Sequence, residues 1–321
     1  MKYIIEFDKV NNYVCDNMEN QEVIDVTMAM RFLESPDSVK LGSASSITEE
    51  AASLLARHDE VLWLRGITIL SSEAAGFLGE SKRPVFLSGL KSISEDVARG
   101  LGACSQGVIL DGLEEISDGV AEALVSRRGG GVDLSSVRKI SDCAISVLAN
   151  GKEWLSFRKL ESISDSAAES LGRLRRLILD GLSEISDASA ESLGHVSDSL
   201  SLCGLNVISD RSAYALSRGP RKLRLDGLVE LSDMAASYLS LHNGELSLRG
   251  LQILSPQSAK VLLCHGFLTT KISLEEISGL PDGELEEIKK TRGNAKEVAL
   301  SKFVNEIMDF KRSAIMKKLD Q

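Results

Sequence analysis

The chain of 321 residues carries a formal net charge of −10, and 43% of its residues are hydrophobic but only 4% aromatic. This acidity argues against a nucleic-acid backbone or an anionic membrane surface as the main partner, because both need a cationic footprint. The scarcity of aromatic residues predicts a core of Leu, Ile, Val and Ala, which suits thin stacked layers.

The cysteines and the N-terminus indicate where the protein works. The five cysteines are odd in number, far apart and never form a C-x-x-C pair, as is typical of a reduced intracellular protein. The first ten residues lack the apolar region of a secretory signal, and no run of about 18 apolar residues occurs. We therefore expect a cytoplasmic protein that does not span a membrane.

Residues 1–36 are predicted to form an N-terminal cap. Short alternating strand patterns cover residues 3–7 and 13–15, and residues 22–34 have the apolar spacing of a helix, at Val23, Val26, Met30 and Leu33. A plain cap and a small interaction module are both open for this segment.

One phrase then recurs along residues 37–290. Its clearest copies are LILDGLSEISDASAESL from Leu177 and VILDGLEEISDGVAEAL from Val108. Eleven copies emerge when each is anchored on the aliphatic residue before the Ser or its stand-in, at spacings of 22 to 26 residues and most often 23. The anchors are Ile47, Leu70, Ile93, Ile116, Ile140, Ile163, Ile185, Ile208, Leu231, Leu254 and Leu280.

Each copy predicts a strand, a turn and a short helix. Apolar residues eight and six positions before the anchor, such as Leu62 and Leu64, have the period of a strand with one buried face. Gly four positions before the anchor, in seven copies, indicates a sharp turn where the chain leaves the strand. The Ser after the anchor, usually followed by Asp, predicts a helix N-cap. An Ala five positions after the anchor would let this helix approach the sheet closely.

Units of about 23 residues are too small to bury their own apolar faces, so they must stack. Right-handed crossovers then place one parallel sheet on a concave side and the short helices on a convex side. The phrase L-x-L-x-G-L-x-x-I-S-D-x-x-A-x-x-L resembles the leucine-rich repeat. It is closest to the cysteine-containing subtype, with Leu in place of Cys at Leu90, Leu113, Leu182 and Leu205, and it is similar to short bacterial repeats. The resemblance implies an α/β leucine-rich-repeat solenoid.

Residues 291–321 predict an amphipathic helical cap at the C-terminal end. Between residues 294 and 319, apolar side chains including Leu300, Phe303, Val304 and Ile307 line one face, and the last stretch is basic. A cap with a frayed tail is one interpretation, and docking to a partner or self-association is the other.

The sequence offers little support for catalysis or metal binding. The four histidines, His58, His195, His242 and His265, all fall just after predicted helices, where a donor suits the free carbonyls. The repeated Ser-Asp pairs are explained as N-caps, and the glycines at Gly100, Gly102 and Gly107 lack dinucleotide-binding spacing. We therefore expect a protein that is not an enzyme and has no cofactor and no metal.

The residues between the strand leucines predict a recognition surface on the concave side. Trp63, Phe86 and Ile109 fall on three consecutive strands, and adjacent exposed apolar side chains commonly mark an interaction site. The alternative is that these three pack on one another or under the N-terminal cap. Trp154, one residue before its strand leucine, is a further aromatic candidate or a covered edge residue.

A second column of concave residues is mostly polar. We expect ion pairs of Arg158 with Asp180 and of Asp226 with Arg249, which keep the sheet soluble or form a polar recognition strip. The remaining candidate partner-binding residues are Arg65, Asp111 and Arg224.

Together these patterns predict a scaffold that binds a protein or peptide on its concave face. The alternative is a structural subunit of a larger assembly, docked through its terminal caps. The sequence leaves the identity of the partner and the oligomeric state open.

Overall fold

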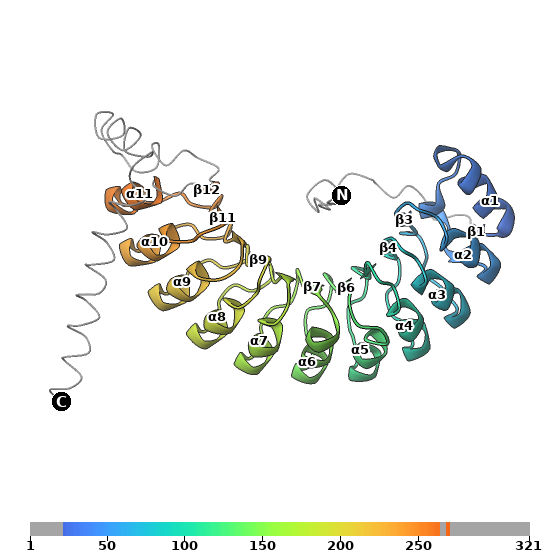
Figure 1. Ribbon diagram of the computed structural model, residues 1–321, viewed down its shortest axis with the longest axis horizontal. Helices are drawn as coiled ribbons and strands as arrows, with labels where there is room; N and C mark the ends of the chain where they lie inside the picture. The colour runs from blue at the N-terminus through green and yellow to red at the C-terminus, as the bar shows by residue number, and fades with distance from the viewer. Residues whose placement is uncertain (1–21, 264–267, 270–321) are drawn as a thin grey trace.

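The structure is a computed structural model, and it describes residues 22–263 and 268–269. Figure 1 shows an open arc in which the strands line the inner, concave side and the helices form the outer, convex side. Each strand leads to the next through one helix, as the repeated phrase predicts. The fold is thus an α/β leucine-rich-repeat solenoid.

Ten strands form one parallel sheet, in which each strand pairs with its neighbours in chain order. The register joins equivalent positions of successive repeats, so that Leu62 lies opposite Val85 and Val85 opposite Val108. The strands are β3 Leu62–Trp63, β4 Val85–Phe86, β5 Val108–Ile109, β6 Gly131–Asp133, β7 Trp154–Ser156, β8 Arg176–Ile178, β9 Ser199–Ser201, β10 Lys222–Arg224, β11 Glu245–Ser247 and β12 Leu268–Thr269.

The helices begin where the Ser residues predict. From α2 to α10 a Ser or Thr precedes the helix and accepts a hydrogen bond from a backbone N–H, as Ser186 does from Ser189 at 2.9 Å. The Ala five positions after the anchor is fully buried, as in Ala75 and Ala190. The helices are α1 Val26–Glu34, α2 Glu49–Leu55, α3 Ser72–Gly79, α4 Glu95–Leu101, α5 Asp118–Leu124, α6 Asp142–Gly151, α7 Asp165–Leu171, α8 Asp187–Leu193, α9 Asp210–Ser217, α10 Asp233–Ser240 and α11 Pro256–Leu263.

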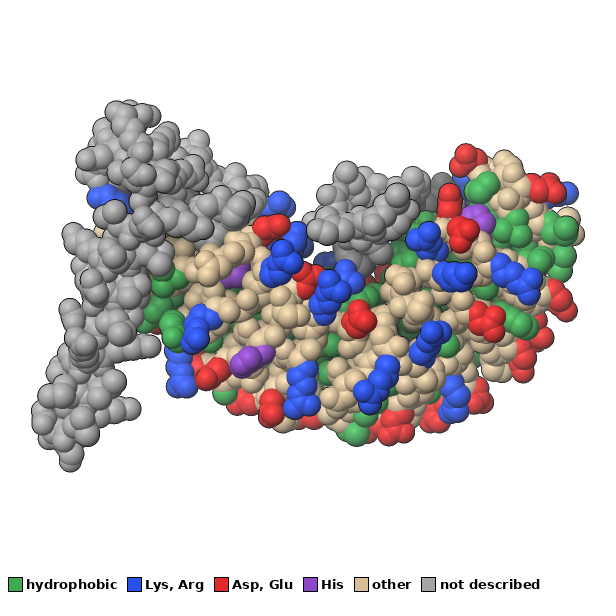
Figure 2. Space-filling view, in the orientation of Figure 1, with side chains coloured by type: hydrophobic (Ala, Val, Ile, Leu, Met, Phe, Trp, Pro, Cys, Tyr) green, Lys and Arg blue, Asp and Glu red, His purple; other side chains and the backbone are tan. Residues whose placement is uncertain are grey.

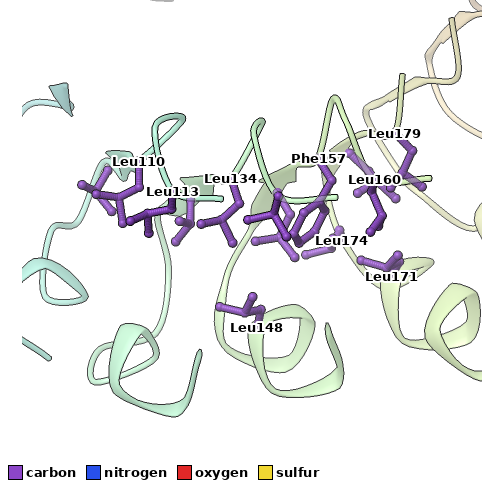
Figure 3. Close-up of a cluster of buried hydrophobic side chains, with 14 of the residues drawn as sticks. Leu110, Leu113, Leu134, Leu148, Phe157, Leu160, Leu171, Leu174 and Leu179 are labelled. Carbon is purple, nitrogen blue, oxygen red and sulfur yellow. The ribbon is translucent and has the colours of Figure 1, made fainter. Parts of the chain in front are cut away.

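One continuous apolar core runs between the sheet and the helices. Figure 3 shows its central part, where Leu134, Phe157 and Leu179 of successive strand segments point into the same layer as Leu148 of α6 and Leu171 of α7. All five side chains are buried. Each contributes roughly 1.5–3 kcal/mol by leaving water, so the stack of layers stabilises the arc.

The seven loop glycines lie in turns, as predicted, but close packing rather than a positive φ is the reason for glycine there. None of the seven has a positive φ, since positive-φ glycines in the described part of the chain are Gly107, Gly129 and Gly130. A Cβ at Gly112 would instead lie 2.0 Å from the carbonyl oxygen of Ser88, and one at Gly204 would lie 2.2 Å from that of Asp180. Glycine is therefore needed because the loops of successive repeats approach one another closely.

Acidic and basic side chains lie at opposite ends of the helices. Acidic residues such as Asp165 and Asp187 occupy the first turns, and arginines such as Arg173 and Arg218 follow the last turns, as the helix dipole favours. Figure 2 shows Lys and Arg side chains spread along the arc on the face in view, with Asp and Glu gathered toward the convex rim.

The two ends of the array depart from the repeat. Helix α1 begins at Val26 rather than at residue 22, because Asp25 caps it and β1 (Val23–Ile24) pairs with β2 (Ser46–Ile47) in a separate two-stranded sheet. The strand predicted near residues 39–41 of the first repeat is wrong, since 3-10 turns at Pro36–Ser38 and Leu41–Ser43 take its place.

The strand of the last repeat begins earlier in the chain than the anchor Leu280 predicts. Counting back from Leu280 predicts it near residue 272, but β12 pairs Leu268 with Leu246. The anchor spacing of 26 in this repeat misleads the count, whereas 22 residues separate the paired positions. The strands predicted at residues 3–7 and 13–15 and the helix predicted at residues 294–319 lie outside the described residues.

Candidate functional site

Trp63, Phe86 and Ile109 lie side by side on β3, β4 and β5, because the parallel register joins equivalent positions. The rings of Trp63 and Phe86 stack with their centroids 4.0 Å apart. Trp63 is 42% exposed, whereas Phe86 is 5% and Ile109 is 2% exposed. The indole of Trp63 therefore offers the contact surface, and Phe86 and Ile109 support it from one side by packing together.

Trp154 of β7 joins the same apolar cluster, which we call the aromatic patch and define as Trp63, Phe86, Ile109 and Trp154. Its indole lies over two glycines that occupy the same repeat position on the preceding strands. A Cβ at Gly131 would be 2.1 Å from the indole, and one at Gly107 would be 2.6 Å from it. The two glycines thus leave the space that brings Trp154 toward β5. The sequence signal was available, because Gly107, Gly131 and Trp154 all lie nine residues before their anchors.

Arg65 lies beside the two stacked rings of the aromatic patch and contacts both. Its guanidinium carbon lies 4.5 Å from the ring centroid of Trp63 and 5.7 Å from that of Phe86, within the range of a cation–π contact. Its Nε is buried and has no hydrogen-bond partner among the described residues. Arg65 therefore brings a positive charge and unused donor capacity to the exposed indole of Trp63.

The polar column farther along the concave face is well satisfied. Arg158 forms the predicted ion pair with Asp180, at 3.1 Å. Asp180 also accepts hydrogen bonds from the Ser201 hydroxyl at 2.5 Å and from the Cys203 N–H at 3.1 Å. These contacts fix the Asp180 carboxylate against β9.

Asp226 repeats this arrangement two repeats later. It accepts from the Ser247 hydroxyl at 2.5 Å and from the Arg249 N–H at 3.1 Å. The predicted ion pair with the Arg249 side chain is wrong, because Arg224 on the neighbouring side takes that place at 3.2 Å. Burial raises the pKa of Asp226, but hydrogen bonds from Ser247 and Arg249 and the charge of Arg224 outweigh it, so the pKa lies below its ordinary value.

Asp111 and the neighbouring Asp133 have fewer favourable contacts than Asp180 and Asp226. Asp133 is 5% exposed, and burial together with the charge of Asp111 raises its pKa to about 6, against hydrogen bonds from Ser135 and Ser156 and the charge of Arg158. Asp111 is half-buried, and its Oδ1 has no hydrogen-bond donor in the part of the chain that the structure describes. The concave face therefore holds one incompletely satisfied carboxylate pair beside Ile109.

The histidines have structural roles in the described part of the chain. The Nδ1 atoms of His195 and His242 bond to the carbonyl oxygens of Ser192 and Ser217, at 3.2 and 3.0 Å, as predicted for residues after a helix. His58 instead accepts from the Glu60 N–H. His265 lies outside the described residues. Across residues 22–263, no group of three or more His, Cys, Asp or Glu side chains is placed to hold a metal ion.

The structure therefore brings some of the predicted site residues together and separates others. Trp63, Phe86, Ile109, Trp154 and Arg65 form one patch, and Asp111 lies beside it on the strand segment of β5. The Arg158–Asp180 pair lies on neighbouring repeats, and Arg224 belongs to β10, far from the aromatic patch along the arc (Figure 1).

Comparisons with known proteins add the following. No family model matches the sequence, and no curated protein is significantly similar to it. Among solved structures, an internalin from Listeria monocytogenes is 15% identical with a TM-score of 0.41, over 70% of each chain. A leucine-rich-repeat protein of Leptospira interrogans is 14% identical with a TM-score of 0.37, over 78% of this chain and 82% of that one. The recurring phrase, the single parallel sheet and the helices on its convex side give this chain the fold of a leucine-rich-repeat solenoid.

Proposed function

We propose that the protein is a non-enzymatic scaffold that binds a protein or peptide on its concave face, with Trp63 and Arg65 as the anchor. The observation that carries this proposal is the exposed indole of Trp63, which stacks on the ring of Phe86 and contacts the guanidinium of Arg65. Trp and Arg are the residues most often found at binding hot spots. Because both side chains are already held in place, they lose little conformational entropy when a partner binds.

The buried members of the patch support this role indirectly. Phe86 stacks on the indole of Trp63 and packs with Ile109 and Trp154 in one buried cluster, and these three contribute little surface of their own. Of the three predicted contact residues, Trp63, Phe86 and Ile109, we therefore propose only Trp63 as a direct anchor, together with Arg65. Farther along the concave face, Arg158 pairs with Asp180 and Arg224 with Asp226, so these residues are engaged with one another.

The test uses the full chain as bait in an extract of its native cells, with bound proteins quantified by mass spectrometry. We expect Trp63→Ala and Arg65→Ala each to reduce capture of the partner about tenfold or more, as loss of a hot-spot side chain does. Ile69→Ala is the matched control, because Ile69 is an exposed apolar residue of a loop outside the strands. Equal capture by Trp63→Ala and the wild type would contradict the proposal.

A second function, as a structural subunit docked through its caps, is favoured by one observation. The N-terminal end exposes Val23, Val26 and Met30 together, and within the described residues β1 pairs with β2 alone. Light scattering after size exclusion tests it: Met30→Glu lowers the mass of the assembly if this end docks on another chain. An unchanged mass would contradict docking through this N-terminal face.

A further inference from the structure

Three aspartates occupy the same repeat position on the concave face, five residues before their anchors: Asp111, Asp180 and Asp226. Asp180 and Asp226 each accept from a Ser hydroxyl on the next strand and from a backbone N–H two residues farther on. The fold therefore supplies two donors to a carboxylate at this position when the next strand carries Ser201 or Ser247.

Asp111 lacks both of these donors, the Ser hydroxyl and the backbone N–H. The residue that corresponds to Ser201 is Asp133, which has no hydroxyl to donate. The N–H that corresponds to that of Cys203 belongs to Ser135, and it bonds to Asp133 Oδ1 at 2.9 Å instead. Two carboxylates thus face the place where the other repeats have a carboxylate and a hydroxyl.

The surroundings of the pair do not neutralise it. The hydroxyl of Ser135 bonds to Asp133 and also contacts the hydroxyl of Ser156, while Arg158 forms its ion pair with Asp180. Asp111 Oδ1 keeps no donor among the described residues. A buried acceptor without a donor is costly, and a second carboxylate beside it adds repulsion.

We propose that the Asp111–Asp133 pair receives the Lys or Arg side chain of a bound peptide, and this inference rests on the proposed peptide-binding function. A cation supplies both the missing donors and the missing positive charge, as in charge-assisted hydrogen bonds elsewhere. Asp133 is 5% exposed but Asp111 is only half-buried, so a cation reaches the pair from the side of Asp111.

The position of the pair also sets the spacing within the peptide. Asp111 follows β5 and Trp63 belongs to β3, so two strand spacings, or roughly 10 Å, separate them across the sheet. An extended chain covers this distance in about three residues. The peptide that fits therefore carries an apolar side chain for Trp63 and a basic side chain about three positions away.

The test selects random nonapeptides from a displayed library on the full-length wild type and on two variants. Asp133→Ser supplies the residue that the equivalent positions already have, Ser201 and Ser247, so Asp111 regains a donor and the chain is expected to fold. Asp96→Ser is the matched control, because it removes the same charge at an exposed position of α4. We expect the wild type and Asp96→Ser to select peptides with Lys or Arg at a fixed offset from an apolar residue, and Asp133→Ser to lose that preference.

A labelled consensus peptide then gives the affinities by fluorescence anisotropy. Asp133→Ser should bind at least about tenfold more weakly than the wild type, and Asp96→Ser within about twofold, as for the loss of one member of a close charge pair. Replacing the basic residue of the peptide by norleucine should weaken binding to the wild type by a similar factor and leave binding to Asp133→Ser unchanged.

The outcomes separate the two proposals. Selected peptides without a basic preference, or the same preference on Asp133→Ser, overturn the cation site and leave peptide binding standing. A wild type that selects no peptide contradicts the proposed function itself. If Asp133→Ser does not fold, the norleucine peptide on the wild type decides alone.

Discussion

The indole of Trp154 depends on the absence of side chains at two neighbouring positions. Gly131 and Gly107 lie under it, and a methyl group at either would overlap its ring or force it away from the aromatic patch. The cluster of Phe86, Ile109 and Trp154 is therefore set by two glycines as much as by its apolar members.

Gly131→Ala should lower the free energy of unfolding by about 1–3 kcal/mol, the usual cost of overpacking. The measurement is urea denaturation followed by circular dichroism. Gly76→Ala is the control: no atom lies within 4 Å of its added Cβ, so in helix α3 it should stabilise by roughly 0.5–1 kcal/mol. If the Gly131→Ala variant is as stable as the wild type, Trp154 does not pack against Gly131 as described.

The raised pKa of Asp133 predicts a pH-dependent effect of its removal. A carboxyl with a folded-state pKa near 6 and an ordinary value of 3.8 favours folding in its neutral form, and this contribution is lost as the pH rises through about 6. Asp133→Ser should therefore be more stable than the wild type at pH 7.5, by about 1–3 kcal/mol. The advantage should shrink when both proteins are melted at pH 5. A constant difference across this range would contradict the assignment.

At the scale of the helices, the capping serines from Ser141 to Ser255 also link two repeats. Ser209 accepts from the N–H of Ser212 at 3.0 Å to cap α9, and its hydroxyl donates to Asp187 in the first turn of α8. Ser212 donates to the same carboxylate at 2.8 Å. The pattern continues through Ser141, Ser164, Ser186, Ser232 and Ser255. The Ser-Asp phrase thus builds a ladder along the helix N-termini as well as caps.

This ladder predicts a difference between two capping serines. Ser71 caps α3 at 3.1 Å from the Ala74 N–H, but the preceding repeat has Glu49 in place of Asp, and no hydrogen bond joins the two in the described structure. Ser71→Ala should cost about 1 kcal/mol of unfolding free energy, and Ser209→Ala about 1 kcal/mol more.

The extra cost of Ser209→Ala should depend on pH. Hydrogen bonds from Ser209 and Ser212 lower the pKa of Asp187 below 3.8, so the ladder stabilises the fold above that pH and is lost as the pH falls through the lowered value. Denaturation midpoints at pH 7 and pH 2.5 measure this. Equal costs for both variants at pH 7 would show that the ladder contributes nothing.

The sequence predicts elements well where the repeat is regular. Strand positions, N-caps and the adjacency of Trp63, Phe86 and Ile109 follow from phase alone, because parallel stacking brings equal positions together. It fails at the ends, where β1 pairs with β2 and the anchor spacing changes, since no second neighbour enforces the period there. The exposure of single side chains could not be predicted from their phase: Phe86 and Ile109 form a buried cluster with Trp154, whose indole lies over Gly131 and Gly107.

The polar contacts of the site show the same limit. The Arg158–Asp180 pair was predictable from neighbouring positions. The partner of Asp226 was not, because Arg224 and Arg249 both lie within reach and the backbone N–H of Arg249 takes the second oxygen. Likewise, which carboxylate receives the Ser135 N–H depends on the side-chain geometry of Asp133.

On the scale of the whole arc, each repeat contacts its neighbours and little else, so damage should stay local. Phe157 fills a core position where the adjacent strand segments have Leu134 and Leu179, and it is fully buried (Figure 3). Phe157→Ala should cost about 3–5 kcal/mol, and Phe157→Leu less than about 1.5 kcal/mol. Hydrogen exchange of Phe157→Ala should accelerate most in α6, α7 and α8. Equal acceleration in α2 would indicate a single cooperative unit instead.

Hydrogen–deuterium exchange of the full chain, with and without a partner captured by it, tests the central claim most directly. The account predicts slower exchange at β3, β4 and β5 and in the loops that follow them, where Trp63, Arg65 and Asp111 lie, with little change in the convex helices α3 to α5. Protection confined to those helices or to α1, with the concave strands unchanged, would contradict it.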